Sequence, residues 1–200
     1  MRRLMAGFVM ALFVGAALGA IGCSGKEAAT AAVDAAQASF NAVKGDAVKV
    51  LPDETQKLSD ALATARTDID QGKIKEAMDA AKAMPDQVKQ LADAAAKRKD
   101  ELTASWNSVS AELPKAVDAV QEKVDALSKD PNLPAGLDAT TFAGIKESLT
   151  VMKQTWADAQ AEFQGGDLAA AIAKVGTIKQ ALASAMPALH LEIPAALKVS

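Results

Sequence analysis

The stretch DATTFAGIKESLTVMKQTWADAQAEFQ, residues 138–164, is the part of the sequence that decides the fold. Its apolar side chains recur at alternating steps of three and four: Phe142, Ile145, Leu149, Met152, Trp156, Ala159 and Phe163. Such steps give a seam with a period of 3.5 residues, which is typical of near-parallel helices that pack knobs-into-holes at about 20°. The stretch therefore predicts one helix roughly 40 Å long with one buried face.

Two earlier stretches repeat this pattern. One seam is formed by Val33, Ala36, Phe40, Val43, Ala47 and Val50, and another by Leu51, Thr55, Leu58, Leu62, Ala65 and Ile69. The chain is rich in alanine and other helix-forming residues and has no tyrosine, a composition that favours an all-α fold. Alanines at interleaved positions are expected to let the helix backbones approach closely: Ala29, Ala36, Ala65, Ala95 and Ala159.

Prolines and glycines divide the chain into helices. Pro52, Pro85 and Pro114 each follow an apolar residue and predict helix starts, with a kink as the alternative at Pro85. Gln71-Gly72 and Gly165-Gly166 predict C-terminal caps. The expected helices are 27–50, 53–71, 73–84, 86–112, 114–128, 138–164 and 167–186, and the longest loop is 129–136. Short connections make neighbouring helices antiparallel, so we expect an elongated antiparallel helical bundle over 27–186, with one core.

A faint internal repeat links the two glycine turns. Five positions from Gly72 to Ala81 align with five from Gly166 to Val175, and the residues before each glycine align as well. The pattern predicts two similar helix-glycine-helix hairpins. The glycine-to-alanine spacing also resembles the middle of a tetratricopeptide repeat, although the glycine, tyrosine and terminal proline positions of that motif are not met across the chain.

The N-terminus has the organisation of an export signal. Arg2 and Arg3 precede an apolar run from Leu4 to Gly15, and small residues lead up to Cys23, the only cysteine. The run Ala20-Ile21-Gly22-Cys23 resembles the lipobox of bacterial lipoproteins, with Ala20 where leucine is usual. The resemblance implies that residues 1–22 are a cleaved signal peptide, that Cys23 is acylated, and that 23–26 form the anchor and a short tether.

Three alternatives compete for this segment. Leu4–Gly22 is nearly long enough to span a bilayer uncleaved, an ordinary secretory signal looks similar, and the arginine pair raises twin-arginine export. Neither of the first two accounts for the position of the lone cysteine, and the rest of the twin-arginine motif is absent around Arg2 and Arg3. Two or more acyl chains hold a protein firmly on a membrane, and Ser24 resembles the pattern exported to the outer membrane. We therefore expect a periplasm-facing protein on the outer rather than the inner membrane.

The net charge of the chain argues against some classes of binding partner. The formal charge of −3 becomes −5 after cleavage, because Arg2 and Arg3 are lost and no acidic side chain is. A mildly acidic body argues against nucleic acid and against docking onto anionic lipid through a basic face. With only Ser24, Gly25 and Lys26 as tether, the bundle is expected to find protein partners in its own membrane.

The catalytic inventory is thin, and the sequence predicts no enzyme, cofactor or metal site. His190 is the only histidine, so no pair of histidines can form a metal site. Acidic pairs such as Asp68 and Asp70 are expected to lie on solvent-exposed faces of helices. No phosphate-binding loop or dinucleotide fingerprint occurs. Lys97-Arg98-Lys99 is followed by Asp100 and Glu101, which indicates local pairing rather than an anion-binding patch. Trp106 and Trp156 continue apolar series, so we expect them in the core rather than stacked on a ligand.

The segment 187–200 lacks helical rhythm. Leu189, Leu191 and Ile193 alternate with His190 and Glu192, which predicts an extended tail that lies across a groove of the bundle or pairs with a partner's sheet edge. Together these features favour a non-enzymatic envelope lipoprotein that serves as a helical scaffold or protein-interaction module. The alternative is a binding protein that holds a small apolar or envelope-derived ligand in a bundle groove.

Overall fold

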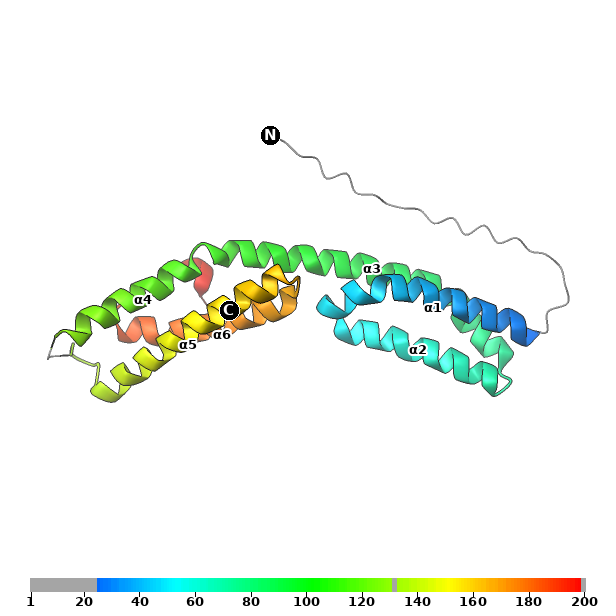
Figure 1. The fold of residues 1–200 in the computed structure, drawn as a ribbon, viewed down its shortest axis with the longest axis horizontal. Helices are drawn as coiled ribbons and strands as arrows, with labels where there is room; N and C mark the ends of the chain where they lie inside the picture. The colour runs from blue at the N-terminus through cyan, green and yellow to red at the C-terminus, as the bar shows by residue number, and fades with distance from the viewer. Residues whose placement is uncertain (1–24, 131–132, 199–200) are drawn as a thin grey trace, which may run out of the picture.

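The computed structural model describes residues 25–130 and 133–198, and it confirms an all-α helical bundle (Figure 1). Within these ranges the elements are α1 (Gly25–Val50), α2 (Pro52–Asp70), α3 (Ile74–Ser110), α4 (Leu113–Ser128), α5 (Ala139–Gln164), α6 (Leu168–Ala188) and one 3-10 turn, η1 (Ala195–Leu197). No strand occurs in the described part of the chain.

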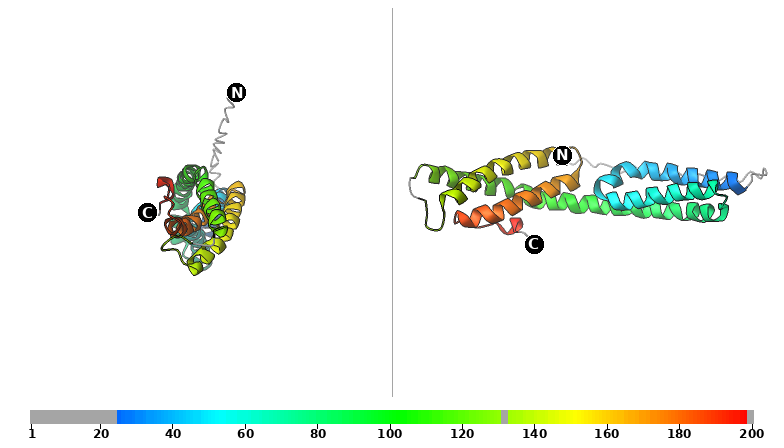
Figure 2. Two further views of the ribbon diagram at one scale, coloured as in Figure 1. Left: turned by 90° about the vertical axis from the view of Figure 1, so that its left-hand side faces the viewer. Right: turned by 90° about the horizontal axis from the view of Figure 1, so that it is seen from below.

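The helices form a rod of two three-helix units joined by α3 (Figures 1 and 2). The first unit contains α1, α2 and the first part of α3. The second contains α4, α5 and α6, and α4 continues roughly along the direction of α3. Because α3 has 37 residues, it is about 56 Å long, so it runs along the first unit and reaches into the second (Figure 1).

Each unit has its own hydrophobic core, where the sequence led us to expect a single one. The first core is built from buried residues between Ala29 and Ala95, and the second from residues between Trp106 and Leu197. Every residue of α3 from 96 to 101 is exposed between them. The division follows from length, since α1 and α2 have 26 and 19 residues and cover only the first part of α3.

The predicted seams face these cores. In α5 the seam residues are buried except Trp156 and Phe163, which are partly buried against the second core. The seams of α1 and α2 line the first core in the same way, with only Val43, Val50 and Leu51 partly exposed. All five interleaved alanines are buried, as expected: Ala29, Ala36, Ala65, Ala95 and Ala159.

The helix starts predicted at two prolines are confirmed, and the start predicted at the third is wrong. Pro52 and Pro114 lie in the first turns of α2 and α4. Pro85, however, lies inside α3, so the predicted helices 73–84 and 86–112 are one continuous helix. Pro85 is exposed while Met84 and Val88 on either side of it are buried. The buried face is therefore uninterrupted, and packing outweighs the helical hydrogen bond that proline cannot donate.

The two glycine turns share one backbone structure. Gly72 and Gly166 have positive φ of 77° and 79°, and their N–H groups donate to the carbonyl oxygens of Ile69 and Phe163, both at 3.1 Å. Beyond each turn the aligned alanines, Ala77 and Ala171, are completely buried. The predicted pair of helix-glycine-helix hairpins is thus present. A 34-residue tetratricopeptide unit does not fit, because α3 alone is longer than that.

The C-terminal segment packs on the second core. Pro187 lies inside α6, which ends at Ala188 rather than 186, because Leu182, Met186 and Leu189 continue its buried face. The segment 189–198 forms no strand, but Leu189 and Leu197 are fully buried and η1 contacts α3. The predicted alternation therefore places the apolar side chains against the bundle and leaves His190 exposed.

Candidate functional site

The candidate anchor lies just before the first described helix in the sequence. Cys23 and the signal segment 1–22 lie outside the described residues. Helix α1 begins at Gly25, so the bundle starts two residues earlier than the predicted boundary at Glu27. The start of α1 lies at the outer end of the first unit, far from the second unit (Figure 1). Only Ser24 separates Cys23 from the first residue of α1.

The length and polarity of the described helices bear on membrane crossing. Within 25–130 and 133–198, no helix is both long and apolar enough to span a bilayer. The uncleaved span considered for 4–22 lies outside the described residues.

The side chains considered for chemistry are dispersed. His190 is exposed and has a positive φ of 58°. It lies two residues beyond the C-terminal end of α6, whereas the turn at Gly166 precedes the N-terminal end of that helix. Asp68 pairs with Lys73 at 3.6 Å, and Asp79 pairs with Lys75 at 3.8 Å. Among the described residues, no three potential metal ligands come together and no buried side-chain polar atom is left without a hydrogen bond.

The two tryptophans meet in one aromatic stack at the start of the second core. Trp106 of α3 lies between Trp156 and Phe163 of α5, with ring centroids 5.1 and 4.4 Å apart and ring planes within 12° of each other. Trp106 is buried, as expected, whereas the outer two rings are partly buried. The stack joins α3 to α5.

The basic cluster divides into paired and unpaired side chains. Lys97 and Arg98 both approach Glu101, at 3.9 and 3.3 Å, which confirms the predicted local pairing for these two. Lys99 has no ion pair with any described residue. It lines a pocket instead.

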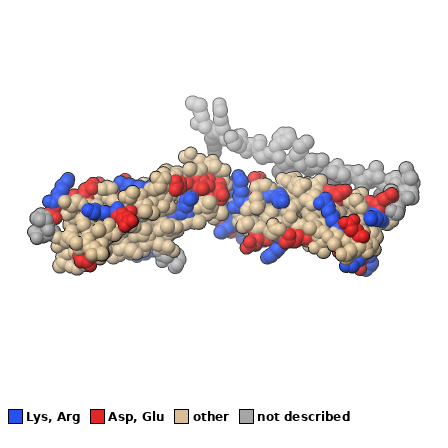
Figure 3. Space-filling view, turned by 60° about the horizontal axis from the view of Figure 1, so that its bottom comes forward, with Lys and Arg blue, Asp and Glu red and all other residues tan. Residues whose placement is uncertain are grey.

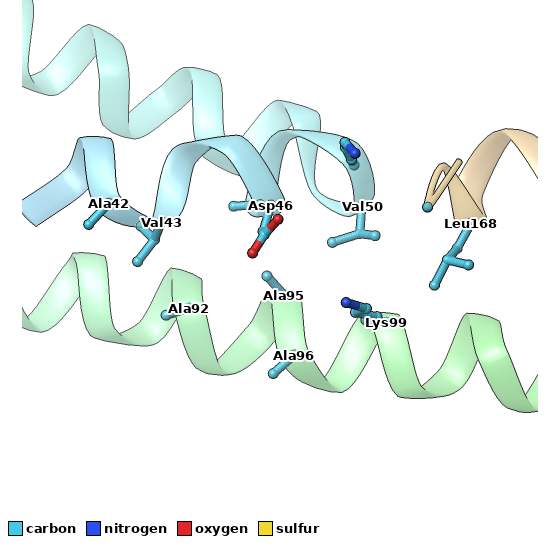
Figure 4. Close-up of a pocket in the computed structure, with 12 residues that line it drawn as sticks. Ala42, Val43, Asp46, Val50, Ala92, Ala95, Ala96, Lys99 and Leu168 are labelled. Carbon is cyan, nitrogen blue, oxygen red and sulfur yellow. The ribbon is translucent and has the colours of Figure 1, made fainter. Parts of the chain in front are cut away.

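This pocket, which we call the junction pocket, lies where the two units meet (Figure 4). It has a volume of about 360 Å³ and is bounded by the end of α1, the middle of α3 and the start of α6. Asp46 and Lys99 project into the gap between α1 and α3, and Val50 and Leu168 face it (Figure 4). Lys49 is its third ionisable residue.

Sequence reasoning did not find the junction pocket, because its walls come from segments far apart in the chain. The available signal is local to α3: Ala92, Ala95 and Ala96 are small residues close before Lys99, and they leave space on this side of the helix. That pattern is also typical of ordinary close helix packing.

A second hollow lies on the first unit. An open apolar groove of about 490 Å³ runs between α2 and α3, with Leu51, Leu58, Ala61, Leu91 and Ala94 in its walls. Polar side chains of both helices border it: Glu54, Lys57, Gln87 and Gln90.

The surface charge is mixed. On the face shown in Figure 3, acidic and basic side chains occur on both units, and neither sign covers a whole unit. The described surface therefore shows no broad basic face there of the kind that nucleic acid or anionic lipid requires.

The chain was compared with protein-family models, with curated proteins and with solved structures, and no match was found in any of the three comparisons.

Proposed function

We propose that this chain is a non-enzymatic bacterial lipoprotein of the cell envelope, anchored at Cys23 and acting as a helical scaffold or protein-interaction module close to the membrane. The observation that carries the proposal is the position of the only cysteine. It follows Ala20-Ile21-Gly22 and precedes the first residue of α1 by two positions. An acylated Cys23 would therefore join the lipid almost directly to a helix.

The shape of the rod supports a scaffold near the membrane. With the anchor at the start of α1, the first unit lies next to the bilayer. Helices α3 and α4 have 37 and 16 residues and follow one another along the rod, which gives a length of roughly 80 Å. The first unit would meet partners in the same membrane, while the second, if the rod stands upright, would extend into the periplasm.

A non-enzymatic role rests on the dispersed chemistry of the described residues. An enzyme site needs a nucleophile or base held beside an orienting group. Here the ion pairs among the described residues lie mostly on exposed helix faces, as that of Lys89 and Asp93 does at 2.7 Å.

In-cell crosslinking tests the proposal. We expect wild-type protein to capture membrane proteins or lipoproteins of the same membrane, and Cys23→Ala to lose most of that capture. A flexible insert of about twenty residues after Ser24, ahead of α1, would move the first unit away from the bilayer and weaken capture while leaving the helices intact. Capture that is unchanged by both alterations would contradict a membrane-proximal scaffold.

A further inference from the structure

We propose that the junction pocket binds a small anionic amphiphile, a molecule with one alkyl or acyl chain and a carboxylate or phosphate monoester head. The inference goes beyond the proposed scaffold role. It uses only described residues, so it holds whether or not Cys23 is acylated.

Charge in the pocket selects the head group. Lys49 comes from α1 and Lys99 from α3, and neither forms an ion pair with a described residue. Asp46 also lines the pocket, and it lies outside ion-pair distance of both lysines. The three side chains sum to one positive charge. A single carboxylate neutralises this charge, and a phosphate monoester, with a charge of about −1.5 to −2 at pH 7, more than balances it. Charge-assisted hydrogen bonds from an ammonium group to an anionic oxygen are roughly twice as strong as hydrogen bonds between neutral groups.

Shape and polarity select the tail. Val43, Val50 and Leu168 provide apolar walls, and small alanines of α3 leave room between them. A volume of about 360 Å³ is at the low end of the range of roughly 300–1,000 Å³ usual for ligand pockets. The space therefore suits one chain rather than a diacyl lipid.

The location of the pocket would allow a bound ligand to contact both units of the rod. Val50 belongs to the first unit and Leu168 to the second, whereas the exposed stretch 96–101 of α3 is the only described backbone that crosses between the units. A ligand that touches both walls adds contacts between the units. Binding to the folded state alone also raises the melting temperature of the protein.

The test uses residues 23–200 made without acylation, because both described cores consist of residues between 29 and 197. The probe is decanoate below its micellar concentration, measured by titration calorimetry, with decyl phosphate and decanol in parallel. We expect one saturable site for either anion, and binding of decanol weaker by about tenfold or more, because it lacks the charged head.

Variants locate the site. Lys49→Gln combined with Lys99→Gln should weaken decanoate binding by about tenfold or more. The matched control, Lys82→Gln with Lys129→Gln, removes two exposed lysines outside the pocket and should bind like wild type. Ala96→Leu fills the space without changing charge and should also weaken binding. Circular dichroism checks that each variant is folded.

Three results would overturn the proposal. One is the absence of saturable decanoate binding to the folded wild-type chain. Another is equal affinity for decanol and decanoate, or for inorganic phosphate alone and decyl phosphate. The third is undiminished decanoate binding by the folded double lysine variant. Because the chain in this test carries no lipid, none of these results bears on the anchor.

Discussion

Leu149→Ala tests whether the seam of α5 forms the second core. Leu149 is 4% exposed and lies between Ile145 and Met152 on that seam. The substitution removes three carbons, worth about 2.4 kcal/mol at roughly 0.8 kcal/mol each, and the residual cavity brings the usual cost to about 2–5 kcal/mol. Leu149 also borders an open hollow with Gln121 and Lys153, so neighbouring side chains can relax into the gap. We therefore expect a loss of about 2–3.5 kcal/mol in unfolding free energy.

Urea denaturation followed by circular dichroism measures this loss, with Val151→Ala as the matched control. Val151 is in the same helix but is 56% exposed, so its truncation should change the unfolding free energy by less than about 0.5 kcal/mol. Hydrogen exchange then shows where the loss acts. Amides of α5 and α6 should lose protection, and those of α2 should keep it, because its side chains lie in the other core. Equal small losses from both substitutions would refute the assignment of the buried face.

The remaining predictions concern helix ends and glycines. The pKa of Asp138 lies below its ordinary 3.8 because the backbone N–H of Thr141 and then its hydroxyl donate to the carboxylate, at 2.7 and 3.1 Å. The stabilisation by these hydrogen bonds is complete at pH values above the pKa that the carboxyl group has in the unfolded chain. It is lost as the pH falls through the lower pKa that the group has in the folded chain. Asp138→Ala should therefore melt below wild type at neutral pH with a gap that closes in acid; melting curves between pH 2 and 7 check this, and a gap that widens in acid would contradict it. Gly72→Ala and Gly166→Ala should each cost about 1–2 kcal/mol in urea denaturation, because both glycines have positive φ. Gly45→Ala, in a helix with open space at the added carbon, should instead stabilise by up to about 1 kcal/mol, and similar effects at all three positions would contradict this reading.

Local rules predicted the helices well where one stretch carried the whole signal. The α5 seam, the proline starts of α2 and α4, and the two glycine turns each depend on residues within a few positions of one another. Gly72 and Gly166 show this most clearly, because the aligned sequences give matching backbone hydrogen bonds. Such features follow from helix period and turn chemistry.

The sequence did not predict the features that depend on how the helices pack against one another. Pro85 is tolerated inside α3 because it lies on the solvent-exposed face of the helix. The residues next to Pro85 in the sequence do not determine which face of the helix is exposed. The division into two cores depends on how far α1 and α2 extend along α3. The junction pocket unites Val43, Ala95 and Leu168, which lie far apart in the sequence and meet only when both units are assembled.

The mass of the mature protein isolated from membranes tests the central claim most directly. If Cys23 is the lipid anchor, the N-terminal peptide should begin at Cys23 and carry at least two acyl chains, and Cys23→Ala should leave the chain unprocessed. A mature membrane protein that retains Met1, or that begins at an unmodified Cys23, would contradict the account.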